Sequence, residues 1–389
     1  MREIYLDNSA TTKISREALD KYIEISSQCY GNPSSLHAYG FRAEKILTQA
    51  RAEILSSLGA VGSTVIFCGS GSEANNLAIF GRAYSKERYK RGAKIIITDS
   101  EHASVSECIS RLEKEGFKVE KIPTKCGKID TGALSEALTP DTVLVSVMMV
   151  NNETGALYDV AAVSRLARAK APDAYVHVDA TQSYMKLPFT KSSLGADMIT
   201  LSSHKIEGPK GVGALVIDPR VVKERGLTAI TLGGGQELGL RSGTENVPAI
   251  AAFGEAVRIG AKNLRSRYEK MRTLRDHLIK KLDTSPALSE ISVTNPEKSA
   301  PHILNITLPK IKSETMLHFL SSRGIYVSSG SACSSNSHHL SSSLIAYGRT
   351  REEADCSIRI SFSHTNELSD VDALIDALTE GLAGLARIR

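Results

Sequence analysis

Two patterns of apolar and polar positions alternate along the first two thirds of the chain. Short runs rich in β-branched residues have the length of buried strands, and stretches with helical spacing lie between them. This alternation predicts a mainly parallel α/β sheet with helices on both faces and a site beyond the carboxyl ends of the strands. The predicted strands are 64–68, 94–98, 119–122, 143–150, 175–179, 198–201 and 213–217, and the predicted helices include 72–91, 103–114 and 160–169.

The pattern changes near residue 246. Helical spacing continues over 246–282, which predicts one long connecting helix. Three strand-like runs and a terminal helix starting at Glu367 follow, so a second, smaller α+β domain is expected. We expect a large domain over 15–255 and a small domain formed by 1–14 and 256–389. The three strand-like runs are 303–309, 324–330 and 357–363.

Composition narrows the class of protein. A chain of 389 residues with 41% hydrophobic and 23% charged residues is globular and long enough for two packed domains. The net charge of +5 is spread along the chain and gives little support for nucleic-acid binding, so no direct binding of nucleic acid is expected. The polar N-terminal segment lacks a signal core, and no apolar run approaches about 20 residues, so we expect a soluble protein without a membrane span.

The six cysteines include no CxxC pair, which excludes a zinc knuckle and a thioredoxin-like motif. Their low density does not fit a disulfide scaffold and indicates a reducing cytoplasm. Core packing suits Cys68 and Cys108, whereas Cys333 lies in the polar stretch SSGSACSSNSHH and is a candidate nucleophile. The adjacent His338 and His339 lack further ligands, so no metal site is predicted.

Three strand ends carry candidate cofactor chemistry. In CGSGSEANNLAIF (68–80) a helix follows a Gly/Ser turn near Ser72, which is typical of a phosphate site or of an ordinary helix cap. Asp179 ends an apolar strand, either as a cap or as the partner of a buried cation such as a protonated pyridine nitrogen. Lys205 ends another strand and is better suited than Lys210, within the next turn, to form a Schiff base. Together these are the parts of a pyridoxal phosphate site.

The strand SIRISFS contains one cation with apolar neighbours. Because Ile358 and Ile360 flank it, Arg359 is expected on the opposite side of the sheet. The guanidinium is suited to bind the carboxylate of an amino acid, but a surface ion pair is about equally consistent with the pattern.

At this point the sequence resembles a known family over nearly its whole length. It is similar to the class I cysteine desulfurases of the NifS/IscS type. The resemblance implies a homodimeric fold type I pyridoxal phosphate enzyme with a seven-stranded sheet, which removes sulfur from L-cysteine and leaves L-alanine. The matching segments are YLDNSATT, GNPSSLH, GSEANN, SEHASV, VNNETG, HVDATQS, SSHKIEGPKG, GGGQELGLRSGTENVPAI, SSGSACSS and SIRIS.

The resemblance also implies roles for individual residues. Lys205 is expected to bind the cofactor and to take the Cα proton of the substrate, and Asp179 to pair with the pyridinium. His102 is expected to stack on the ring and to help with proton transfer. Arg359 is expected to bind the substrate carboxylate, and Cys333 to attack the substrate sulfur and to carry it as a persulfide.

The remaining expected contacts surround the cofactor. Gln182 and Asn152 are placed on the side of the ring oxygen, with Asn152 also near the substrate carboxylate. Thr244 is expected to come from the neighbouring subunit and to contact the phosphate. The other residues expected at the phosphate are Gly71, Ser72, Ser202 and His204.

Sulfur is expected to pass from Cys333 to an acceptor protein for iron–sulfur clusters, thio-cofactors or tRNA thiolation. A selenocysteine lyase or a related pyridoxal phosphate enzyme is the close alternative. A non-catalytic sulfur-carrier docking protein is the alternative from a different class, and the joint presence of Lys205, Asp179, His102, Arg359 and Cys333 argues against it.

Overall fold

The computed structural model describes residues 2–86, 93–329 and 341–387. Its centre is a seven-stranded sheet with the order β2-β8-β7-β6-β5-β3-β4. The antiparallel strand β8 lies between β2 and β7, and all the other strands run in the same direction. The bounds are β2 Thr64–Cys68, β3 Lys94–Thr98, β4 Lys118–Ile122, β5 Thr142–Met148, β6 Tyr175–Asp179, β7 Met198–Ser202 and β8 Gly213–Ile217.

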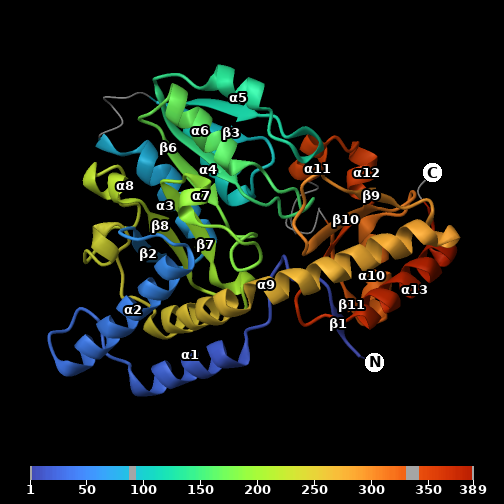
Figure 1. Cartoon of the computed structure of the whole chain (residues 1–389), viewed down its shortest axis with the longest axis horizontal. Helices are drawn as coiled ribbons and strands as arrows, with labels where there is room; N and C mark the ends of the chain where they lie inside the picture. Colours follow the sequence, from blue (N-terminus) through green and yellow to red (C-terminus); the bar gives the residue numbers. More distant parts are fainter. Residues whose placement is uncertain (1, 87–92, 330–340, 388–389) are drawn as a thin grey trace.

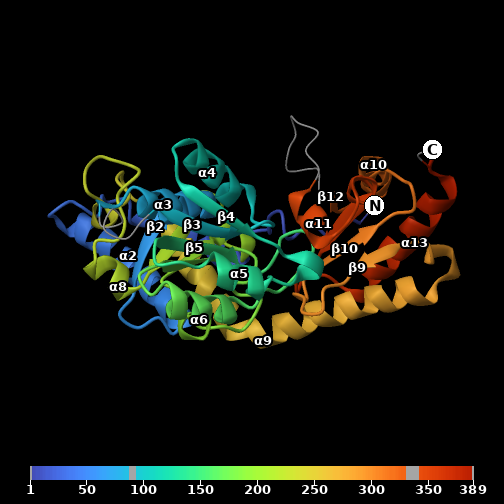
Figure 2. The ribbon, with the colours of Figure 1, turned by 90° about the horizontal axis from the view of Figure 1, so that it is seen from above.

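Helices cover both faces of this sheet, as Figure 2 shows with α3 and α4 above it and α6 and α9 below it. Each strand therefore supplies two cores: Val65 and Phe67 pack into one, while Ile66 and Cys68 pack into the other. Burial on both faces explains why the central strands are mostly apolar, whereas the edge strand β4 is largely exposed and carries charged residues. The helices of this part are α1 Arg16–Gln28, α2 Ala38–Ser57, α3 Gly71–Ala83, α4 Ala103–Lys114, α5 Thr131–Ala137, α6 Val160–Lys170, α7 Lys191–Leu194 and α8 Pro219–Lys223, with 3-10 turns at Lys125–Gly127, Ser203–Lys205 and Glu237–Gly239.

The helix α9 (Val247–Thr284) connects this part to a second lobe and runs along both (Figure 1). Its first half packs in the core below the large sheet and its second half in a separate core with β10, β13 and α13. The second lobe holds a four-stranded antiparallel sheet, β12-β13-β10-β9, and a parallel pair formed by β1 and β11. Its elements are β1 Ile4–Tyr5, β9 Ser292–Thr294, β10 Ile303–Thr307, β11 Ile325–Tyr326, β12 Ser328–Ser329, β13 Ser357–Ser361, α10 Ser313–Ser322, α11 Ser342–Tyr347, α12 Arg351–Asp355, α13 Leu368–Gly384 and the 3-10 turn Pro286–Leu288.

This arrangement confirms the fold class that the apolar pattern and the resemblance predict, while the exact domain boundaries stay a prediction. The predicted end of one helix is wrong. The helix expected over 72–91 stops at Ala83, because the N–H of Thr228 binds the Gly81 carbonyl at 2.9 Å and the Ser85 N–H turns to Arg82 instead. Among the described helices, none has the length and apolarity needed to cross a bilayer.

Candidate active site

A cavity of about 280 Å³ opens where the parallel strands of the large sheet end. Segments that follow β2, β3, β5, β6 and β7 line it, and β13 of the second lobe adds one side chain. The large sheet and β13 together bring ten of the predicted site residues to this one cavity. These residues are Gly71, Ser72, His102, Asn152, Asp179, Gln182, Ser202, His204, Lys205 and Arg359.

The other two predicted residues lie elsewhere. Thr244 is exposed and does not line this cavity, so its expected contact with the phosphate in a neighbouring subunit stays a prediction. Cys333 lies outside the described residues, as do His338 and His339.

The first turn of α3 forms one end of the cavity. Ser70 caps it by accepting a hydrogen bond from the Glu73 N–H at 3.1 Å, with an extended backbone that any residue adopts. Gly71 follows, and a Cβ there would lie only 3.1 Å from the Ser202 Cβ. The N–H groups of a first helical turn have no partner inside the helix. With the Ser72 and Ser202 hydroxyls beside them, they offer the donors that a phosphate needs.

Asp179 lies at the end of β6 and is buried. Its Oδ1 accepts the Thr181 N–H at 2.9 Å, and its Oδ2 accepts from Asn75 Nδ2 at 2.8 Å. The local bond matches the capping alternative, but no helix follows, and the carboxylate faces the cavity. The backbone contact orients the carboxylate at the cavity, and its pairing with a cation stays a prediction.

His102 is the N-cap residue of α4. Its Nδ1 accepts the Ser104 N–H at 3.1 Å and lies 2.9 Å from the Ser104 hydroxyl. The side chain is open to the cavity, yet the protein around it removes enough water to lower its pKa. Lys205 and Arg359 lower the pKa of His102 further, while Asp179 acts in the opposite direction.

Lys205 is anchored by the N-terminal segment. Its Nζ donates to the carbonyl oxygens of Ser9 at 2.5 Å and Ala10 at 2.8 Å. Its neighbour His204 is desolvated and surrounded by Lys205, Lys210 and Lys186, which lowers the pKa of His204 to about 4. His204 therefore stays neutral at neutral pH and is suited to donate or accept a hydrogen bond without adding charge. Lys210 is exposed and does not line the cavity.

A buried lysine, Lys186, contacts one of the residues that line the cavity. Lys186 lies 3.4 Å from Gln182 Oε1, while Gln182 Nε2 donates to the same Ser9 carbonyl that binds Lys205. Burial, with Lys205 nearby, lowers the pKa of Lys186 to about 7. This amine orients the amide of Gln182 toward the cavity wall. The local sequence gives no sign that this lysine is buried, because only residues distant in the chain bring it next to the site.

Arg359 is buried, so the alternative of a surface ion pair is wrong. Its guanidinium forms a 2.9 Å ion pair with Asp7 and donates to the Asn152 carbonyl oxygen at 3.0 Å. Desolvation raises the pKa of Asp7 although Arg359 opposes the shift. The pair holds the guanidinium rigidly at the cavity wall. Asp7 belongs to the motif YLDNSATT, and only the fold reveals its contact with β13.

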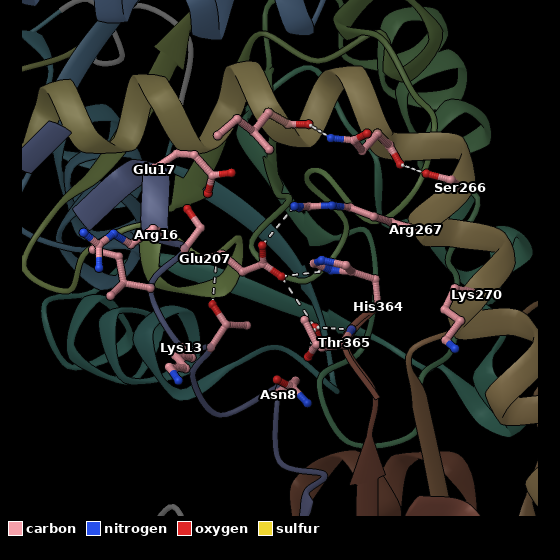
Figure 3. Close-up of a pocket in the computed structure, with 16 residues that line it drawn as sticks. Asn8, Lys13, Arg16, Glu17, Glu207, Ser266, Arg267, Lys270, His364 and Thr365 are labelled. Carbon is pink, nitrogen blue, oxygen red and sulfur yellow. Dashed lines mark hydrogen bonds and ion pairs between the residues drawn. The ribbon is translucent and has the colours of Figure 1, made fainter. Parts of the chain in front are cut away.

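A larger cavity of about 800 Å³ is lined by the N-terminal segment, by α9 and by the segment that follows β13 (Figure 3). Glu207 is at its centre with a positive φ of 66°, and it pairs with Arg267 of α9 and with His364, both at 3.0 Å. Desolvation raises the pKa of Glu207, but these two partners together lower it below its ordinary value. These ion pairs tie the segment after Lys205 to α9 and to the second lobe. None of the predicted site residues within the described ranges lines this larger cavity, whereas ten of them line the smaller one.

The donor set of the smaller cavity fits pyridoxal phosphate. Helix α3 and two hydroxyls offer anion donors at one end, Asp179 offers a carboxylate to a protonated ring nitrogen, and Lys205 offers an amine to the aldehyde. Arg359 adds a fixed guanidinium for the carboxylate of an amino acid.

Comparisons with known proteins agree with this chemistry. The family described as "Aminotransferase class-V" matches residues 4–374. The cysteine desulfurase IscS 1 of Archaeoglobus fulgidus is 37% identical over 96% of this chain and 95% of its own length. Among solved structures, a NifS-like protein superposes with a TM-score of 0.91 at 34% identity over 99% of this chain and all of the other. The structure of SspA in complex with cysteine superposes with a TM-score of 0.76 at 31% identity, over 92% and 98% of the two chains.

Proposed function

The chain belongs to the class-V aminotransferase family and, within it, to the cysteine desulfurases, and we propose that the cavity at Lys205 is where it releases sulfur from L-cysteine. Cysteine desulfurases form L-alanine and pass the sulfur on, and their family depends on pyridoxal phosphate. One observation carries the assignment to this cavity. Lys205, Asp179 and Arg359 come from three different strands or strand ends and converge on a single space.

We propose that the first turn of α3, with Ser72, Ser202 and His204, holds the phosphate of the cofactor. Asp179 would face the ring nitrogen, and His102 would lie against the ring. Gln182 and Asn152 would lie on the side of the ring oxygen. The bound cofactor would supply an electron sink for the substrate.

The protein's own groups then divide the work. The Arg359 guanidinium binds the carboxylate of L-cysteine and orients Cα toward the lysine amine. Lys205 Nζ takes the Cα proton, since it is the amine that lines this cavity among the described residues, and a neutral amine can accept a proton. His204 remains neutral and does not compete for that proton.

We propose Cys333 as the sulfur acceptor. Its thiolate attacks the substrate Sγ, a new S–S bond forms as the C–S bond breaks, and the electron pair of that bond stays with the carbon skeleton, which is protonated to alanine. The described cysteines near the site are less suited than Cys333 to act as the nucleophile. Cys68 and Cys108 are buried, and burial raises the pKa of Cys108 to about 12.

A second copy of the chain is the proposed structural partner. Large apolar side chains are exposed on the segment before α2, on the first turn of α2 and on the segment between α8 and α9, which also carries Thr244. Covering them in a homodimer would remove apolar surface from water and would bring Thr244 to the neighbouring cavity. The exposed side chains are Tyr30, Leu36, Phe41, Leu232 and Leu238.

We further propose that the sulfur goes to a scaffold protein for iron–sulfur clusters or to a thiolation protein for cofactors or tRNA. The reducing cytoplasm is the proposed compartment, because the cysteines in the described segments are all free thiols.

The function is tested by supplying purified protein with pyridoxal phosphate, L-cysteine and a thiol reductant, and by measuring alanine and sulfide. We expect the two products in equal amounts. Comparing L-cysteine with L-selenocysteine tests the selenocysteine lyase alternative, which requires turnover of the selenium substrate alone. Failure to bind pyridoxal phosphate at all would favour the docking protein.

Replacing Arg359 is expected to weaken the use of substrate. Arg359→Ala should lower kcat/KM for L-cysteine about 10- to 100-fold, mainly through KM, because a charged hydrogen-bonded contact to the carboxylate is lost. Arg359→Lys keeps the charge against Asp7 but not the two-pronged geometry, and should fall between the wild type and Arg359→Ala. Steady-state kinetics and the cofactor content of each variant provide the check. An unchanged KM in Arg359→Ala would remove this residue from the substrate site.

A further inference from the structure

The hydrogen bonds of His102 fix which of its ring nitrogens can carry a proton. Ser104 donates its backbone N–H to Nδ1 at 3.1 Å, and a backbone N–H is always a donor. Nδ1 must therefore accept. A neutral imidazole has one donor and one acceptor nitrogen, so the proton of neutral His102 lies on Nε2. Within the described part of the chain Nε2 has no hydrogen-bond partner, and the side chain lines the cavity.

Asn75 extends this chain of hydrogen bonds to Asp179. One amide nitrogen, Nδ2, donates to Asp179 Oδ2 and to the Ser104 hydroxyl oxygen, both at 2.8 Å. The carboxylate only accepts, which identifies the atom facing it as the amide nitrogen. Because the Ser104 oxygen accepts from Asn75, its own proton is free to point to His102 Nδ1 at 2.9 Å. The donors run in one direction, from Asn75 through Ser104 to His102.

We propose that Ser104 and Asn75 are positioning residues that hold His102 as the Nε2–H tautomer and tie it to Asp179. His102 then faces the cofactor and substrate as a hydrogen-bond donor and does not take the Cα proton. The proposal rests on the proposed function of this cavity and narrows it: proton abstraction belongs to Lys205.

Proton accounting supports this division. An Nε2 that already carries its proton has no lone pair with which to accept another. To accept one there, His102 would first have to move its proton to Nδ1, against the Ser104 N–H. To donate one from the neutral state it would have to become an imidazolate. Neither step is favoured at neutral pH, whereas a hydrogen bond from Nε2–H needs no proton movement.

The charges around the His102 ring also favour its neutral form. The N-terminus of α4 presents the positive end of its dipole to His102, which disfavours the imidazolium. Desolvation lowers the pKa of His102, Lys205 and Arg359 lower it further, and Asp179 alone opposes them. These charges favour the neutral form of the His102 imidazole, the form in which the position of the single ring proton is defined. A purely structural helix cap would need Nδ1 as acceptor but would not need the link through Asn75 to Asp179.

The test is nitrogen NMR of the histidine rings in the purified protein, with and without added pyridoxal phosphate. The His102 signals are identified by their loss in His102→Gln. At neutral pH we expect an Nδ1 shift typical of an unprotonated acceptor and a protonated Nε2. An Nδ1–H tautomer or an imidazolium at neutral pH would overturn the proposal. Because these signals are read without turnover, the result is independent of whether alanine is formed.

Ser104→Ala tests the positioning role. Removing a hydroxyl that donates to the neutral ring should raise the pKa of His102 by about half a unit to one unit. Ser106→Ala, on the same helix, is the matched control: the Ser106 N–H binds the His102 carbonyl oxygen at 3.1 Å, a backbone contact that alanine keeps, so the His102 pKa should stay as in the wild type. An unchanged His102 pKa and Nδ1 shift in Ser104→Ala would show that Ser104 does not position the ring.

Discussion

Lys205→Ala is expected to lose at least about a thousandfold of the rate of alanine formation from L-cysteine. Lys205 Nζ is held at the cavity by the carbonyl oxygens of Ser9 and Ala10, and no other amine of the described residues lines that cavity. The variant loses both the covalent attachment of the cofactor and the group that takes the Cα proton. Alanine release under saturating L-cysteine measures the loss.

Lys210→Ala is the matched control for this change. Lys210 is five residues further on, exposed and outside the cavity, so its removal changes the charge equally and should leave the rate near the wild-type value. Borohydride reduction supplies a second measurement, since it should fix the cofactor to the wild type and to Lys210→Ala but not to Lys205→Ala. Fixation in Lys205→Ala would assign the attachment to another lysine.

The sequence predicted the large sheet well because its strands are buried on both faces. Runs such as 64–68 and 175–179 are mostly apolar, and the polar residues that end or follow them mark the carboxyl edge. Asp179 and Lys205 could therefore be placed at one edge from spacing alone. The strand predicted over 324–330 is divided in its described part: β11 pairs with β1 and β12 pairs with β13, so one predicted strand contributes to two sheets.

The contacts that orient the site residues were not predictable in the same way. Asp7 and Arg359 are 352 residues apart, and Asn75 and Asp179 are 104 apart, so no local pattern relates them. Asp7 lies in the motif YLDNSATT and Asn75 in GSEANN, but neither motif indicates which residue its side chain contacts. Lys186 could not be predicted either, because the burial that lowers the pKa of its amine arises only in the folded chain.

Cys333→Ser is expected to abolish persulfide formation and to reduce the release of sulfide and alanine by at least about a thousandfold. Cys333 lies outside the described residues, so the expectation rests on its polar sequence context and on the family. A serine hydroxyl is far less ionised than a thiol with a pKa near 8.5, and it cannot form the S–S bond that breaks the substrate C–S bond. Binding of pyridoxal phosphate and of L-cysteine should persist, because the residues proposed for both lie in the described cavity.

Cys126→Ser is the matched control for Cys333→Ser. Of the cysteines in the described segments, Cys126 is exposed and the others are buried, so it tests whether any accessible thiol suffices. Trapping the protein with an alkylating reagent after incubation with L-cysteine, followed by mass spectrometry, should find the extra sulfur on Cys333 in the wild type and in Cys126→Ser. Turnover of Cys333→Ser at the wild-type rate, or an extra sulfur found only on Cys126, would mean that the cavity transfers sulfur by a different route. Substrate binding without turnover in Cys333→Ser would instead separate the two halves of the reaction: the described cavity positions L-cysteine, and the thiol of Cys333 takes its sulfur.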